Sequence, residues 1–186
     1  MSATNLDSVL PTVKSRCKTM PIDPFDYEQI KDIFENEKTS ISQILYSQSG
    51  GYIGKLAELM TGGDFSESLN LARGIVFDMK NSKQVLGYSS ALASQKSTFL
   101  TKLSLIQELY RDILMSILGQ DTLQQSRDFC EMIEQVKNEF TKEALIEIIE
   151  KIDLCKKQFD ANVNIGMIAD GLLMKILEVK YLCKQK

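Results

Sequence analysis

The stretch KSTFLTKLSLIQELYRDILMSIL, residues 96–118, decides the fold class. Its apolar side chains recur at steps of three and four residues, the spacing of one face of an α-helix. They are Leu103, Ile106, Leu109, Tyr110, Ile113, Leu114 and Ile117. Because such a face must be buried against other helices, the stretch predicts a long helix within an all-α bundle.

The sequence that follows repeats this pattern. One apolar stripe runs from Leu145 to Cys155 and another from Ile168 to Val179, again at steps of three and four residues. Strand patterns are nearly absent. Around the first stretch we therefore expect further helices at about 64–80, 82–94, 121–138, 141–160 and 164–184.

Shorter helical patterns precede this part of the chain. Asp26 is a candidate N-cap for a first helix ending near residue 36, and Ser40 is a candidate N-cap for a second. Pairs of glycines would end the second and third helices, at residues 50–51 and 62–63. We expect a loop-like segment over residues 1–21, a small three-helix bundle over 22–63 and a larger helical bundle over 64–186.

Composition narrows the possible functions. The 186 residues carry a formal net charge of -3, which argues against autonomous binding to nucleic acid. The chain has no histidine and so lacks the commonest neutral-pH acid and base, and no nucleophile has a histidine partner. We therefore expect no catalytic activity in this chain.

The cysteines and the hydropathy pattern give two further expectations. Four cysteines, Cys17, Cys130, Cys155 and Cys183, show no spacing typical of a metal site, so we expect reduced thiols and neither metal nor cofactor. No charged-then-apolar leader opens the chain, and no apolar run approaches the ~18 residues of a membrane span. These features favour a cytoplasmic protein that does not contact a membrane.

Near the N-terminus the chain reads LPTVKSRC, residues 10–17. The triplet Ser15-Arg16-Cys17 resembles the signature of clamp-loader subunits, AAA+ proteins that load sliding clamps onto DNA. The resemblance implies that Arg16 is an arginine finger that reaches the ATP of a neighbouring subunit, where its planar guanidinium stabilises charge on the γ-phosphate. Ser15 and Cys17 would set the packing of the loop. The alternative is a solvated surface arginine.

Residues 50–55, GGYIGK, end like a phosphate-binding loop, but Ser49 stands where its first glycine belongs and Leu56 replaces its Ser or Thr. The stretch instead resembles the clamp-loader sensor 2 motif. Gly51 then takes the first glycine and Gly54 takes the position of the nucleotide-contacting arginine. Since glycine has no guanidinium side chain to reach a phosphate, this departure resembles the non-hydrolysing delta-prime subunits and argues against the gamma/tau ATPase subunits.

Two weaker resemblances lie at the ends of the chain. Thr4 and Asn5 resemble a degenerate sensor 1, for which a polar loop is the alternative. At the other end, Asn162 and Asn164 precede LLMKI, residues 172–176, as in the last collar helix of delta-prime subunits. Together the resemblances imply the end of an AAA+ core over 1–21, a lid over 22–63 and a collar over 64–186. They predict a C-terminal fragment in which Met1 precedes an interior sequence and residues 1–20 are poorly ordered.

The resemblance implies a non-hydrolysing stator subunit of the bacterial clamp loader within the DNA polymerase III holoenzyme. Its collar would contact the gamma/tau and delta subunits, and the assembled complex would bring it to the sliding clamp and to primer-template DNA. One alternative is a fragment of a gamma/tau-type ATPase subunit. Another is an unrelated helical adaptor that binds partner helices in a groove. A stand-alone enzyme is the weakest reading.

Overall fold

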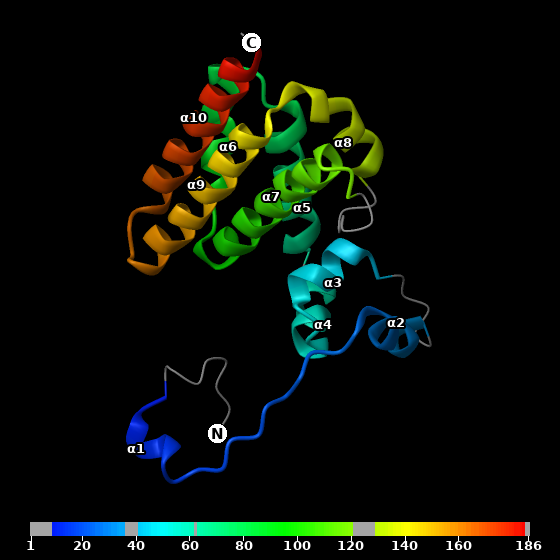
Figure 1. The fold of residues 1–186 in the computed structure, drawn as a ribbon. Coiled ribbons are helices and arrows are strands. Elements are labelled where there is room, and N and C mark those ends of the chain that lie inside the picture. The colour runs from blue at the N-terminus through cyan, green and yellow to red at the C-terminus, as the bar shows by residue number, and fades with distance from the viewer. Residues whose placement is uncertain (1–8, 36–40, 62, 121–128, 185–186) are drawn as a thin grey trace.

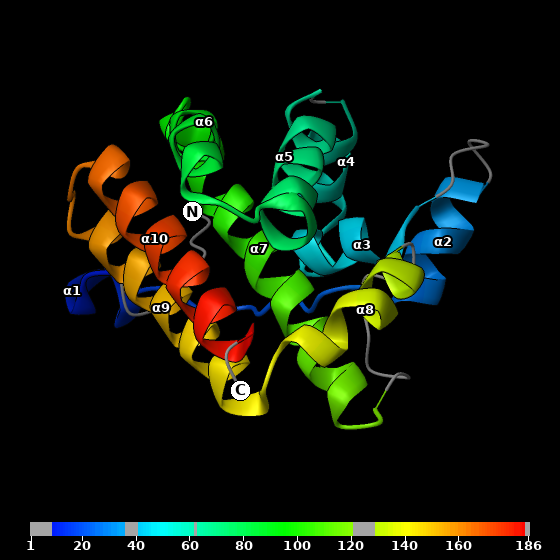
Figure 2. The same cartoon turned by 90° about the horizontal axis from the view of Figure 1, so that it is seen from above.

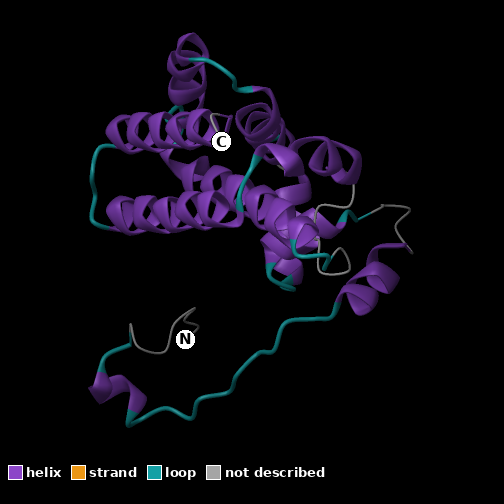
Figure 3. Ribbon diagram, turned by 45° about the horizontal axis from the view of Figure 1, so that its top comes forward, coloured by secondary structure: helices purple, strands orange, loops and turns teal. Residues whose placement is uncertain are grey.

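The computed structural model describes residues 9–35, 41–61, 63–120 and 129–184. Within these ranges the chain forms ten α-helices, with a π-helix and a 3-10 helix, and no strand (Figure 3). The all-α prediction is confirmed. The division into segments 1–21, 22–63 and 64–186 stays a prediction.

The larger group of helices follows residue 63. It comprises α5 (Asp64–Arg73), α6 (Ser82–Leu92), α7 (Lys96–Ile117), α8 (Cys130–Val136), α9 (Lys142–Asp160) and α10 (Ile165–Lys184). Helix α7 packs against α5 and α9, and α10 lies between α6 and α9 (Figure 2). This arrangement buries α7 and leaves one side of α9 and of α10 at the surface.

The stripe on α7 forms the centre of the larger core, as predicted. Leu103, Ile106, Leu109, Tyr110 and Ile113 are all fully buried. Each such side chain contributes about 1.5–3 kcal/mol through removal from water. The apolar residues that α9 and α10 turn inward complete the same core.

Helix α5 continues into a π-helix over Gly74–Asp78 before the chain turns toward α6. Gly74 allows Tyr88 to approach closely, because a Cβ atom at this position would lie 2.9 Å from the Tyr88 ring. The ammonium of Lys180 on α10 donates hydrogen bonds to the carbonyl oxygens of Ile75 (3.2 Å), Val76 (2.7 Å) and Met79 (3.1 Å). Lys180 thereby fixes the end of α10 against the π-helix.

Three shorter helices lie below this bundle in Figure 1: α2 (Tyr27–Glu35), α3 (Gln43–Ser49) and α4 (Ile53–Thr61). They enclose a smaller core of Ile30, Phe34, Ile41, Leu45 and Leu56. Ile44 of α3 lies in the larger core, and Phe65 at the start of α5 packs against both the larger and the smaller core. The two cores are therefore joined by apolar contacts.

Two helix boundaries differ from the predictions. The N-cap of α3 is Ser42, whose hydroxyl accepts a hydrogen bond from the Leu45 N–H at 3.3 Å. The prediction that Ser40 caps this helix is wrong, since the helix begins only at Gln43, and Ser40 itself lies outside the described residues. Of the helix predicted at 121–138, residues 121–128 also lie outside, and α8 occupies 130–136.

The N-terminal segment was expected to be loop-like, but it contains one helical turn, α1 (Pro11–Lys14). Pro11 favours this turn because its fixed φ suits the first helical position, where no N–H bond is needed. An extended stretch then leads to Phe25, whose N–H donates to the Gly51 carbonyl at 2.9 Å. Figure 1 shows α1 standing apart from the other helices.

Candidate subunit-contact surfaces

The turn after α1 carries the Ser15-Arg16-Cys17 triplet. The Ser15 hydroxyl donates a hydrogen bond to the carbonyl of Thr12 at 3.2 Å, and the Arg16 N–H donates to Val13 at 3.1 Å. Both Arg16 and Cys17 are exposed. Among the described residues, the Arg16 guanidinium has no hydrogen-bond or ion-pair partner, so it is available to a group on another molecule.

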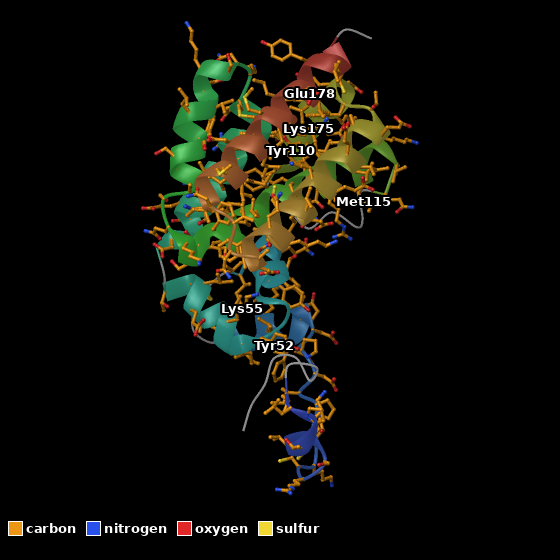
Figure 4. The ribbon with its side chains drawn as sticks, turned by 90° about the vertical axis from the view of Figure 1, so that its left-hand side faces the viewer. Tyr52, Lys55, Tyr110, Met115, Lys175 and Glu178 are labelled. Carbon is orange, nitrogen blue, oxygen red and sulfur yellow. The ribbon has the colours of Figure 1, made fainter. Side chains whose placement is uncertain are left out.

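The glycine-rich turn between α3 and α4 uses two of its glycines: Gly50 ends α3 in a left-handed conformation with a φ of +63°, and Gly51 allows a close contact. Gly51 has a φ of +79°, and a Cβ there would lie 2.7 Å from the carbonyl oxygen of Phe25 and 2.7 Å from Cβ of Pro24. Gly54, in the first turn of α4, has nothing within 4 Å of the corresponding position. Gly51 therefore seats the N-terminal segment against the turn, and Gly54 leaves an open patch of helix surface beside Tyr52 and Lys55 (Figure 4).

The structure does not bring these predicted site residues together. Arg16 follows α1, which lies apart from the turn that carries Gly51 and Gly54 (Figure 1). Thr4 and Asn5 lie outside the described residues. In the described part of the chain, no group of three or more His, Cys, Asp or Glu side chains could hold a metal ion.

A surface that sequence reasoning missed lies on α10. Met167, Met174 and Tyr181 are 72%, 54% and 52% exposed. They are spaced by seven residues, which is two helical turns, so they form one line along the outer side of the helix. We call these three residues the α10 stripe. Their spacing is visible in the sequence, but the denser buried stripe from Ile168 to Val179 obscures it.

The α10 stripe continues onto α9. Lys175, next to Met174, forms ion pairs with Glu147 of α9 at 2.7 Å and with Glu178 of its own helix at 3.2 Å (Figure 4). Leu154 lies seven residues after Glu147, on the same side of α9, and is 46% exposed. The α10 stripe is thus bordered on its α9 side by the ion pairs of Lys175, and the exposed Leu154 lies further along α9.

A small cavity of about 30 Å³ lies where the α10 stripe ends. Tyr181 and Leu177 of α10 line it together with Phe77, Val136 and Phe140 from three other segments. This volume holds about one methyl group or one water molecule. It could therefore accept the tip of one apolar side chain from a partner.

Helices α9 and α10 carry more exposed acids than exposed bases. The exposed acids of α9 and α10 are Glu143, Glu147, Glu150, Asp153, Asp160, Asp170 and Glu178. Among the described side chains of these helices, the exposed bases are Lys142 and Lys157. Of the acids, Asp170 and Glu178 flank the α10 stripe on its own helix, and Glu147 adjoins it through Lys175, whereas Asp153 accepts a hydrogen bond from Gln107 of α7. Three acids and one base thus lie beside the stripe, and this net negative charge favours a partner with basic side chains.

Comparison with known protein families identifies the larger group of helices. Residues 64–178 match the family model described as "DNA polymerase III, delta subunit, C terminal". The matched region is more than half of the chain and includes α5 to α9 and most of α10. No curated protein and no solved structure matches the chain. In the described residues, no helix has the length and apolar character needed to cross a membrane.

Proposed function

Since the chain belongs to the family of C-terminal domains of the DNA polymerase III delta subunit, a clamp-loader family with a role in DNA replication, we propose that it is a non-hydrolysing accessory subunit of the bacterial clamp loader. The more specific assignment is to a delta-prime stator. Its collar would bind the gamma/tau and delta subunits. As part of the assembled loader in the cytoplasm, it would act on the sliding clamp and primer-template DNA.

The observation that carries this proposal is the α10 stripe. Three large apolar side chains stand in a line on the surface of a helix that belongs to the family-matched region. Burial of such side chains in a subunit interface yields about 25 cal/mol per Å² of apolar surface. A subunit that acts through assembly needs a surface of this kind, whereas a stand-alone enzyme would instead need a cleft with reactive groups.

Arg16 gives the proposed subunit its influence on ATP hydrolysis. Phosphoryl transfer places negative charge on the γ-phosphate oxygens, which a guanidinium stabilises through paired hydrogen bonds. Exposure of Arg16 on a turn held by Ser15 suits such a role in trans. Because Gly54 occupies the sensor 2 arginine position, we propose that this chain hydrolyses no ATP itself. This feature also favours delta-prime over a gamma/tau-type ATPase subunit.

Reconstitution of the loader tests this proposal. The chain should assemble with the purified ATPase and delta subunits of the same organism. Replacement of Arg16 by alanine should leave assembly intact and lower hydrolysis at the ATP site that receives it by about 10³-fold. Arg73→Ala, which removes an exposed arginine from α5, is the matched control and should change neither property.

Two results would count against the proposal. Unchanged hydrolysis in the Arg16→Ala loader would remove Arg16 from the mechanism. Failure of the folded wild-type chain to join any loader subunit would favour the adaptor alternative, in which the same helical surface binds an unrelated partner.

A further inference from the structure

The α10 stripe has the repeat of a helix–helix seam. Its three residues recur every seven positions, about 10.5 Å apart along the axis at 1.5 Å per residue. A partner helix with apolar residues every seven positions has the same repeat, and such seams pack side chains of one helix between those of the other. A β-strand repeats at about 3.3 Å per residue and would not keep this register.

The surface between the stripe residues also suits a helix. Gly171 lies between Met167 and Met174, is exposed, and has no atom within 4 Å of the position of a Cβ. The backbone of α10 is therefore open to close approach at Gly171, between the two methionines. A large apolar side chain of the partner can pack against the backbone there, and the cavity beside Tyr181 can accept the tip of another side chain at the end of the stripe.

Charge determines which helix fits. Lys175, the basic residue nearest the centre of the stripe, is already paired with Glu147 and Glu178. Asp170 and Glu178 flank the stripe on α10 and Glu147 adjoins it from α9, so three acids lie beside the stripe with Lys175. A second copy of this chain would bring the same acids against one another, and nucleic acid would bring phosphates against them. A partner with lysine or arginine beside its apolar line is attracted instead.

We propose that the α10 stripe binds a single amphipathic helix of a neighbouring clamp-loader subunit, with apolar residues every seven positions and lysine or arginine beside them. This inference rests on the proposed function and adds the chemistry of the partner. The helix lies along α10 from Met167 to Tyr181 and directs its basic side chains toward the acids of α9 and α10.

The test measures binding of the full chain to the purified ATPase subunit of the loader from the same organism. Met174→Asp places a charge in the middle of the stripe and should weaken binding at least about tenfold, as for a residue at the centre of an interface. Tyr52→Asp makes the same kind of change on an exposed residue of the α3–α4 turn, away from α10 (Figure 4), and should leave binding unchanged. Circular dichroism of each variant checks that the helices are retained.

A second pair of variants tests the charge of the partner. Glu178→Lys should weaken binding about two- to fivefold and reduce its sensitivity to salt, whereas Glu58→Lys on α4, an equal change of charge, should do neither. Binding that is unaffected by salt, or tightened by Glu178→Lys, would overturn the basic partner. Sedimentation of the chain alone should show a monomer, and a dimer that Met174→Asp dissociates would assign the stripe to a second copy.

The outcomes separate this inference from the proposed function. If the wild-type chain binds the ATPase subunit and Met174→Asp binds equally well, the inference fails and the proposed function stands. If the folded wild-type chain binds no loader subunit, both fail.

Discussion

Gly51 and Gly54 lie three residues apart, but replacement by alanine should have opposite effects on stability at the two positions. Alanine at 51 would need a left-handed backbone, which costs about 1–2 kcal/mol, and its Cβ would lie 2.7 Å from two atoms of the N-terminal segment. Alanine at 54 fits a helix with free space around it and should raise the free energy of unfolding by about 0.5–1 kcal/mol. Urea unfolding of Gly51→Ala and Gly54→Ala should therefore show changes of opposite sign. Equal stability of the two variants would contradict the role assigned to Gly51.

Tyr110 has a fully buried hydroxyl with no hydrogen-bond partner among the described residues. Burial raises the pKa of this phenol far above its ordinary value, so it stays neutral. Replacement by phenylalanine removes an unsatisfied polar group, and the free energy of unfolding should stay the same or rise by about 1 kcal/mol. Tyr27→Phe is the matched control, since its hydroxyl donates to the Ile41 carbonyl at 3.0 Å and its loss should cost about 1 kcal/mol. A clear loss of stability in Tyr110→Phe would point to a partner for its hydroxyl.

Single residues differ in how far the sequence predicts them. The exposure of Arg16 agrees with a residue that acts on another molecule, but its role stays a prediction. Ser42 in place of Ser40 as the cap of α3 was not predictable, because both serines lie shortly before Ile44 and Leu45. The burial of Glu108 could not be inferred either, since it depends on α3 packing across α7.

Lys180 joins two elements that are about a hundred residues apart in the chain. Its ammonium donates to three carbonyl oxygens of the π-helix and the residue after it. Lys180→Met would leave these oxygens without that donor and should lower the free energy of unfolding by about 2–3 kcal/mol. Lys83→Met on the exposed side of α6 should have little effect. Similar thermal midpoints for both variants would show that the π-helix does not depend on Lys180.

The contact between α3 and α7 should depend on pH. Gln48 donates to the buried carboxyl of Glu108 at 2.6 Å. Burial raises the pKa of Glu108 above its ordinary value of 4.5, against the opposing hydrogen bonds from Gln48 and Ser47. The folded chain then binds a proton more tightly than the unfolded chain, so stability is lost as the pH rises from 4.5 through the raised pKa.

Replacement of Glu108 by glutamine tests this dependence. Urea unfolding between pH 4.5 and 7 should give a flatter pH profile for Glu108→Gln than for the wild type, with the larger difference at pH 7. The chain has no histidine to add its own slope in this range. Parallel profiles would show that Glu108 titrates as it does in the unfolded chain.

The helices themselves were well predicted because apolar residues at three- and four-residue steps mark a buried face. Helices α6, α7, α9 and α10 begin and end within about two residues of their expected limits. The π-helix at Gly74–Asp78 was not predicted, since a continuous apolar run gives no period to distinguish it from an α-helix. Nor was α1, a single turn too short to have a periodic pattern.

At the scale of the whole molecule, two joined cores hold helices α2 to α10, and α10 lies at the surface between α6 and α9 (Figure 2). The sequence predicts that α10 is amphipathic, but not that its outer side carries a second apolar line. The structure identifies this outer side of α10, because it shows that α6 and α9 cover the other sides of the helix. The proposed binding of a partner helix depends on this arrangement rather than on any sequence motif.

The most direct test of the proposed function is sedimentation of the purified chain mixed with the clamp-loader ATPase subunit of the same organism. We expect a stable complex with the wild-type chain and a large loss of that complex with Met174→Asp, while both chains retain their helical circular dichroism. Folded wild-type chain that sediments alone at every ratio of the two proteins would contradict the assignment to the loader.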